Sequence, residues 1–197
     1  PSEREMKKDR LLAFSDGVIA IIITIMVLEL RPPHEPTLEA LREVGPVFLS
    51  YVLSFVYLAI YWNNHHHMLH TAERVNGGIL WANMHLLFWL SLVPFTTAWM
   101  GETQGAQWPT MVYGCSLLAP AIAYYILQSL IVRTHGSSHA LKRAIGEDIK
   151  GRLSPLLYVA GIAAAFYEPR IGQAMFVLVA LIWLVPDRRI EQAVGGK

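Results

Sequence analysis

The chain has 197 residues with a formal net charge of +1; 54% of them are hydrophobic and only 16% are charged, against about 25% charged residues in soluble domains. Uncharged runs of 29, 27 and 30 residues separate Glu43 from Glu73, Arg74 from Glu102 and Glu102 from Arg133. Since a bilayer-spanning helix needs about 20 mostly apolar residues, these runs exclude a soluble domain, a disordered chain and a secreted disulfide scaffold, and they predict a polytopic membrane protein.

The first apolar segment, residues 11–30, contains a carboxylate, Asp16. A carboxylate inside a membrane-spanning helix costs about 2.5–3.5 kcal/mol on insertion scales, so it normally faces other helices and has partners there. At about 100° per residue, Arg10 and Asp16 lie about 120° apart and cannot pair well with each other. We therefore expect each to bind a residue of another helix near the same level of the membrane. The candidates are Asn63, Asn64, His65, His66, His67, His70, Asn83 and His85.

The same segment has an apolar stripe on a different face. Thr24, Ile25 and Leu28 follow Ile21 at spacings of 3, 4 and 7 residues and fall within about 100° of the helix surface, well away from Asp16. One face is therefore expected to bind other helices, and the other to present branched apolar residues with one hydroxyl. Periodicity alone also allows a plainer interpretation, in which the aliphatic residues face lipid or a neighbouring helix and Thr24 hydrogen-bonds to its own backbone.

The second predicted span, residues 46–63, is followed by four histidines between residues 65 and 70. His66 and His70 share a helix face, a spacing that can hold a metal, and the cluster resembles one histidine box of the membrane desaturases. Those enzymes bind two irons with several such boxes. Even with Glu73 added, this sequence has too few ligands for a di-iron site. We therefore expect neither a metal site nor an enzyme, and interpret the histidines as polar residues that satisfy Asp16 and the membrane boundary.

Four further apolar segments follow, at residues 79–100, 108–132, 153–167 and 171–186. The last two hold 15 and 16 residues, below the usual spanning length, but they can span where the bilayer thins and flanking side chains snorkel. A re-entrant hairpin is the alternative for this pair. The polar stretch 135–152 between the fourth and fifth segments predicts a linker helix. The expected fold is an all-helical single unit of six transmembrane helices over residues 1–197.

Basic residues indicate how six helices would be oriented, because Lys and Arg concentrate on the cytoplasmic side. With the N-terminus inside, 13 basic residues fall on the inner side and only Arg31, Arg42 and Arg170 on the outer side, so both termini are expected in the cytoplasm. Trp62 and Trp183 lie near the inner ends of their spans, where amphipathic rings prefer the membrane interface. The basic N-terminal stretch precedes no small-residue cleavage pattern, which predicts a retained first helix.

The run RLLAFSD, from Arg10 to Asp16, matches the R-x-x-x-F-S-D signature of the transmembrane protein 175 family of potassium channels. The match puts Arg10, Phe14, Ser15 and Asp16 at the start of the first span, with a six-span unit following. The chain resembles a bacterial member of that family, with one such unit per chain where the animal relatives have two. The resemblance implies a homotetrameric, K⁺-selective cation channel in the bacterial plasma membrane.

The resemblance also implies roles for individual residues of the first helix. In the family, the first helices of four subunits line the pore, and aliphatic side chains five and twelve residues beyond the motif aspartate narrow it; here these are Ile21 and Leu28. A hydroxyl eight residues beyond the aspartate is implicated in selectivity, which points to Thr24, and Ile25 is expected to line the pore beside it. The motif residues are implied to be structural. Their candidate partners are His66, His70, Asn83 and His85.

Such a pore would need no cofactor, and the permeant K⁺ would be its cargo. Rings of isoleucine and leucine offer no ligands to an ion and can close a conduit by dewetting. The alternative function is a proton-coupled secondary transporter that uses Asp16 with nearby histidines such as His66 or His85. The missing inverted repeat and the lack of paired, broken helices argue against it. No basic patch with interleaved aromatics indicates a nucleic-acid partner.

Overall fold

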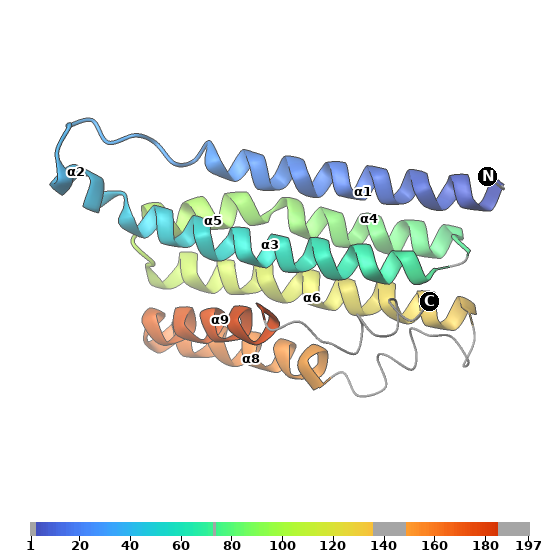
Figure 1. Ribbon diagram of the computed structural model, residues 1–197. Coiled ribbons are helices and arrows are strands. Elements are labelled where there is room, and N and C mark those ends of the chain that lie inside the picture. Colours follow the sequence, from blue (N-terminus) through green and yellow to red (C-terminus); the bar gives the residue numbers. More distant parts are fainter. Residues whose placement is uncertain (1–2, 73, 136–148, 185–197) are drawn as a thin grey trace.

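The computed structural model describes residues 3–72, 74–135 and 149–184, and the regular structure in these ranges is helical (Figure 1). Helices suit a bilayer because they satisfy their backbone hydrogen bonds internally, where lipid offers no partners. The helices are α1 (Glu3–Val27), α2 (Leu38–Glu43), α3 (Gly45–Thr71), α4 (Gly77–Ser91), α5 (Val93–Glu102), α6 (Gln107–His135), α8 (Ile149–Tyr167) and α9 (Pro169–Leu184). The expectation of an all-helical protein is confirmed for this part of the chain.

Four helical segments in the described ranges are long and apolar enough to cross a membrane, judged by length and composition. They are Lys8–Val27, Gly45–Thr71, Gly77–Glu102 and Gln107–Thr134. The apolar stretches Leu153–Tyr167 and Pro169–Leu184 are shorter and form a hairpin beside α6 (Figure 1). The crossing of the membrane by this hairpin therefore stays a prediction. Most of the predicted linker helix and the last two residues of the sixth predicted span lie outside the described residues.

Two helix boundaries differ from the predicted ones. α3 continues past residue 63 and ends at Thr71, so the histidine cluster is part of this helix rather than of the loop after it. α1 ends at Val27, and Leu28 lies in the turn that follows, with its N–H donated to the carbonyl of Ile25 at 3.0 Å. Tighter bonds of this i to i−3 type commonly close a helix, and the prolines at 32 and 33 prevent its continuation.

The third predicted span consists of two helices, α4 and α5, joined at Leu92. Pro94 lies in the first turn of α5 and has no N–H to donate, and its ring would clash with a carbonyl one turn earlier in a continuous helix. The chain therefore breaks there, and the backbone N–H of Leu92 turns to the carbonyl of Trp89 at 3.2 Å. The sequence pattern had predicted one unbroken helix.

The short helix α2 links α1 to α3 and was not predicted. Thr37 caps it by accepting a hydrogen bond from the backbone N–H of Ala40 at 3.2 Å. None of its residues is buried, so α2 adds no core.

Two buried clusters hold the bundle together. Ile19, Leu58, Leu86 and Leu127 are completely buried in the first, which joins α1, α3, α4 and α6. The second is centred on Tyr113 and Phe176 and joins α3 and α6 to the hairpin of α8 and α9. The two clusters place α1 at one edge of the bundle and the hairpin at the other (Figure 1).

The turn between α5 and α6 fixes the far end of the hairpin. Gly105 has φ +71°, which is costly for residues with a side chain, and a Cβ there would meet the amide nitrogen of Gln173 at 2.1 Å. That amide donates to the carbonyl of Gly105 at 3.1 Å and to the hydroxyl of Thr110 at 3.0 Å. A glycine at this turn thus lets α9 bind to the start of α6.

Candidate functional site

α1 turns one face toward the bundle and leaves the other open. Ser15, Ile19, Ile22 and Met26 recur at spacings of four, three and four residues and are buried. They belong to the side of α1 that packs on α3, α4 and α5. This is the period of a helix with one face in a core.

The opposite face of α1 presents the predicted pore residues. The side chains of Ile21 and Leu28 are 58% and 74% exposed, and those of Thr24 and Ile25 are exposed as well. The stripe derived from periodicity therefore coincides with a face that a single chain does not cover. A pore-lining role for these four residues stays a prediction, because that role depends on other copies.

Thr24 makes the backbone contact that the plainer interpretation expected. Its Oγ1 lies 3.0 Å from the carbonyl oxygen of Ala20 and 2.9 Å from that of Ile21. The hydroxyl can donate its single proton to only one of these carbonyls at a time, and its lone pairs stay available as acceptors. An exposed side chain in this arrangement offers oxygen, not hydrogen, to whatever lies against α1.

An apolar groove of about 810 Å³ runs beside the open face, between α1 and α5. Ile21 and Ile25 form part of one wall, and Phe95 and Trp99 form part of the other. Glu102 lines the same groove together with Glu29 and Arg31, which follow α1. The open face is therefore flanked by a groove with apolar walls and with these charged residues in its lining.

A chain of buried hydrogen bonds ties the start of α1 to two other helices. Ser15 donates to the carbonyl of Leu11 at 2.8 Å and accepts from the amide of Asn83 on α4 at 2.9 Å. The amide oxygen of Asn83 lies 2.7 Å from Nε2 of His65 on α3, so Nε2 must carry the proton. Ser15, Asn83 and His65 are completely buried. Because breaking one bond would leave its partner buried and unpaired, this chain fixes the position of α1.

Asp16 is bound by a residue outside the predicted set. The indole N–H of Trp62 on α3 donates to Oδ1 of Asp16 at 3.0 Å. The sequence pattern had placed Trp62 at the membrane interface as an anchor, and histidines and asparagines were named as partners instead. The position of Trp62 could have identified it as a partner of Asp16, because it lies one helical turn before His66 on the helix that faces α1.

The rings of neighbouring histidines lie close together along α3, in tilted and edge-on arrangements. The ring centroid of His66 lies 4.4 Å from that of His70 and 5.9 Å from that of Trp62. Nδ1 of His66 is buried without a hydrogen-bond partner in the described part of the chain. No group of three or more His, Cys, Asp or Glu residues among the described residues is placed to hold a metal.

The remaining motif residues, Arg10 and Phe14, are exposed, and two of the candidate partners, His70 and His85, contact residues outside the motif. The ring of Phe14 is 51% accessible, so a single chain does not enclose these motif residues. His85 accepts from the indole of Trp89 on its own helix at 2.8 Å. His70 contributes its backbone carbonyl, which accepts from the ammonium group of Lys8 at 2.7 Å. Of the four candidate partners, Asn83 is the one hydrogen-bonded to a motif side chain.

Comparisons with known proteins agree on one family. A family model described as "Endosomal/lysosomal potassium channel TMEM175" matches residues 10–94, which begin at the motif arginine. A potassium channel of Chryseobacterium sp. (strain P1-3) is 53% identical over 188 residues, covering 95% of this chain and 98% of its own length. A potassium channel of Streptomyces collinus is 32% identical over 133 residues, which is 64% of this chain and 65% of that protein.

A solved structure has the same fold over nearly the whole chain. The crystal structure of a lysosomal potassium-selective channel TMEM175 homolog from Chamaesiphon minutus superposes with a TM-score of 0.79 at 27% sequence identity. The superposition covers 91% of this chain and 97% of that one. The overall fold of this chain is therefore one that a potassium-selective channel also has.

Proposed function

Because this chain belongs to the TMEM175 family, we propose that it is a potassium channel in which four copies gather around α1. Its relatives are named as channels rather than enzymes, and its apolar helices make it a multi-pass membrane protein. The names of these relatives also favour a K⁺ channel over the proton-coupled transporter that Asp16 and the histidines suggested.

The open face of α1 is the observation that carries the proposal. Ile21, Thr24 and Leu28 stay exposed although Ile22 and Met26, on the same helix, are buried. Four such faces around one axis would form an aliphatic ring at Ile21 and another at Leu28, in the turn that follows α1. The groove beside α1 offers room for the α1 of a neighbouring copy.

The two aliphatic rings would act as a hydrophobic constriction. Leucine and isoleucine offer no ligands to an ion, so a narrow ring of them excludes water and closes, while a wider one admits a partly hydrated cation. Between the rings, Thr24 would supply four hydroxyl oxygens. Since each of these hydroxyls directs its proton to backbone carbonyls, cations would be preferred over anions.

The proposal extends to topology and place in the cell. Six helices would cross the bilayer as a single unit, with α8 and α9 crossing where it thins, and both termini would lie in the cytoplasm. The membrane would be the bacterial plasma membrane. The channel would need no bound cofactor, because its chemistry is the passage of K⁺ alone.

The test is K⁺ flux from liposomes that contain the purified protein. We expect a current that reverses at the K⁺ equilibrium potential without a proton gradient. Ile21→Asn should raise the leak current by placing a polar group in the first ring, and Leu28→Ala should raise it by widening the second. Val177→Asn, on the exposed side of α9, is the matched control and should leave the current unchanged.

Two outcomes would overturn the proposal. Flux that occurs only with proton counter-transport would make the protein a coupled transporter. Unchanged conductance in both Ile21→Asn and Leu28→Ala would place the pore elsewhere than on α1.

A further inference from the structure

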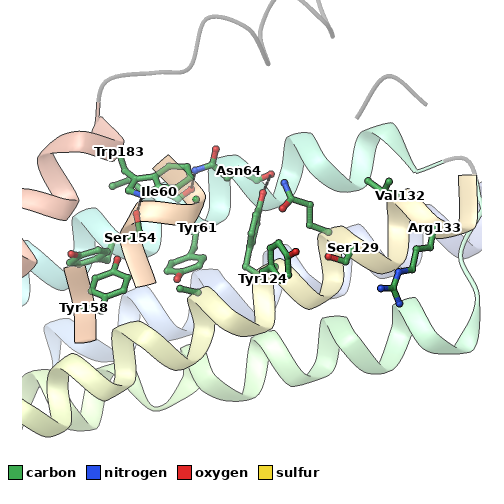
Figure 2. A pocket seen from close by; sticks show the side chains of 15 residues that line it. Ile60, Tyr61, Asn64, Tyr124, Ser129, Val132, Arg133, Ser154, Tyr158 and Trp183 are labelled. Carbon is green, nitrogen blue, oxygen red and sulfur yellow. Dashed lines mark hydrogen bonds between the residues drawn. The ribbon is translucent and has the colours of Figure 1, made fainter. Parts of the chain in front are cut away.

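A second cavity lies on the far side of the bundle from the open face of α1. It has a volume of about 340 Å³ and lies among α3, α6, α8 and α9, where it is lined by fifteen residues (Figure 2). This volume is in the range of small-molecule sites. Among the described residues, the cavity forms because α8 and α9 are much shorter than α3 and α6 and cover only part of both helices (Figure 1).

The cavity is long and parallel to the helices. On α6 its lining runs from Ala121 to Arg133, which is twelve residue steps or about 18 Å. The hydrocarbon core of one leaflet is about 15 Å thick. The cavity therefore has the length of one lipid leaflet and its ester region, at the end of the bundle where α3 and α6 terminate.

Polarity changes along this length. At the deep end, the walls are mainly aromatic and aliphatic, with Tyr57, Tyr158 and Ile60. The hydroxyl of Ser154 at this end already accepts a hydrogen bond from the indole of Trp183 at 2.8 Å. In the middle lie Tyr61, Gln128 and Ser129. At the shallow end lies Arg133, and Figure 2 shows it at the opposite end of the row from Trp183 and Tyr158. The order from apolar, through neutral polar, to cationic is the order in which a phospholipid presents acyl chain, esters and phosphate.

The polar groups of the cavity are available to a ligand. The side chains of Tyr61, Gln128 and Ser129 make no hydrogen bond to any residue that the structure describes, although Tyr61 and Gln128 are at least partly buried. Arg133 is exposed and forms no ion pair within the described ranges. None of these side chains has a completely buried, unpaired polar atom, so their polar groups and the guanidinium of Arg133 can be reached by a ligand in the cavity.

The rim of the cavity is itself apolar. Tyr125 lines it and is 63% exposed, and Ile122, one turn of α6 earlier on the same side, is 47% exposed. A rim of this kind, on a helix that spans the membrane, opens toward lipid tails rather than toward water. A lipid could therefore enter sideways from the bilayer.

From these observations we infer that the cavity binds one anionic phospholipid of the adjacent leaflet. Its acyl chain lies along Tyr57 and Tyr158, its ester oxygens accept hydrogen bonds from Tyr61, Gln128 and Ser129, and its phosphate pairs with Arg133. The inference goes beyond the channel function and requires only that the bundle lies in a bilayer. Its test measures binding, so the channel proposal and the lipid proposal can fail independently.

The experiment is native mass spectrometry of the full-length protein, purified in detergent and incubated with dioleoyl phosphatidylglycerol or dioleoyl phosphatidylcholine. We expect one phosphatidylglycerol retained per chain, and weaker retention of phosphatidylcholine. Arg133→Gln should weaken retention of phosphatidylglycerol on the order of tenfold, because it removes a charge-assisted bond. Ser129→Leu should abolish retention of both lipids by filling the cavity.

Matched controls separate the cavity from the rest of the surface. Arg42→Gln removes one exposed charge from α2, and Ser91→Leu adds the same bulk on the exposed side of α4; both should retain lipid like the parent chain. Equal losses in Arg42→Gln and Arg133→Gln would indicate attraction to charge in general and would overturn the inference. So would unchanged retention in Ser129→Leu, or no retained lipid in the parent chain.

Discussion

At the scale of single residues, the start of α1 is held by two different kinds of contact. Ser15 is part of a buried, neutral chain with Asn83 and His65, whereas Asp16 is a partly buried carboxylate bound by an indole N–H. An indole is a donor only, which suits a carboxylate that only accepts. The ring of Trp62 also lies next to the ring of His66, so one side chain links the motif to the histidine cluster.

Loss of this indole bond should destabilise the folded bundle. Asp16→Ala should lower the folded yield, and Trp62→Phe should lower the free energy of unfolding by about 1–2 kcal/mol, since a hydrogen bond to a charged group is lost. The measurement is thermal unfolding in detergent, followed by size-exclusion chromatography. Trp81→Phe, at an indole that is 79% exposed, is the control and should leave the midpoint unchanged. Equal midpoints for Trp62→Phe and Trp81→Phe would contradict the anchoring role of Trp62.

Thr24 should affect selectivity without affecting stability. Its hydroxyl is exposed and contacts only the backbone of its own helix, so Thr24→Ala removes a cation-binding oxygen and little packing. We expect a weaker preference for K⁺ over Na⁺ in bi-ionic reversal potentials, with unchanged folded yield. Thr103→Ala removes an exposed hydroxyl with the same backbone contact off α1, and should leave the reversal potential unchanged. An unaltered potential in Thr24→Ala would remove Thr24 from the pore.

At the scale of helices, close packing at glycine explains the hairpin of α8 and α9. A Cβ on Gly172 would lie 2.7 Å from the carbonyl oxygen of Gly161 and 2.7 Å from the Cβ of Ala165. A Cβ on Gly161 would likewise meet the ring of Phe176 at 2.6 Å. Small residues let membrane helices approach closely where lipid gives no hydrophobic driving force for their association. Close packing at these glycines thus stabilises the hairpin, although its helices are short.

Widening this contact should loosen the hairpin. Gly172→Val forces the two helices apart and should lower stability by about 1–3 kcal/mol, as overpacking of a filled interior does. The check is the thermal midpoint against Gly77→Val, whose added side chain begins in open space at the start of α4. A midpoint for Gly172→Val at or above that of Gly77→Val would show that the close approach is not needed.

At the scale of the whole molecule, the single chain has two unlike sides. One side presents the open face of α1 and the groove beside it, and the other presents the hairpin and the tyrosine-lined cavity. A closed assembly would bring copies of the first side together and leave the second toward lipid. The pore and the lipid site that we propose would therefore lie on opposite sides of each subunit.

Cysteine cross-linking tests this arrangement. In a Cys115→Ser background, which removes the only cysteine of the chain, Leu28→Cys should form covalent dimers on oxidation. Disulfides need Cα atoms within about 7 Å, a distance that a constriction at Leu28 would bring about. Tyr167→Cys, on the highly exposed end of α8, is the control and should stay monomeric. Dimers from Tyr167→Cys alone would reverse the proposed orientation of the subunit.

The sequence by itself determined the class of the protein and the faces of its first helix. The length of the uncharged runs and the spacing of apolar residues are local properties of the sequence. They predicted membrane helices and put Ile21, Thr24 and Leu28 on one side of the first helix. The tertiary structure decided the rest, because partners across helices depend on packing angles that no local pattern encodes. It paired Trp62 with Asp16 and placed tyrosines of three helices around one cavity. The break of the third span before Pro94 is instead a local effect of the proline, which the apolar pattern alone did not reveal.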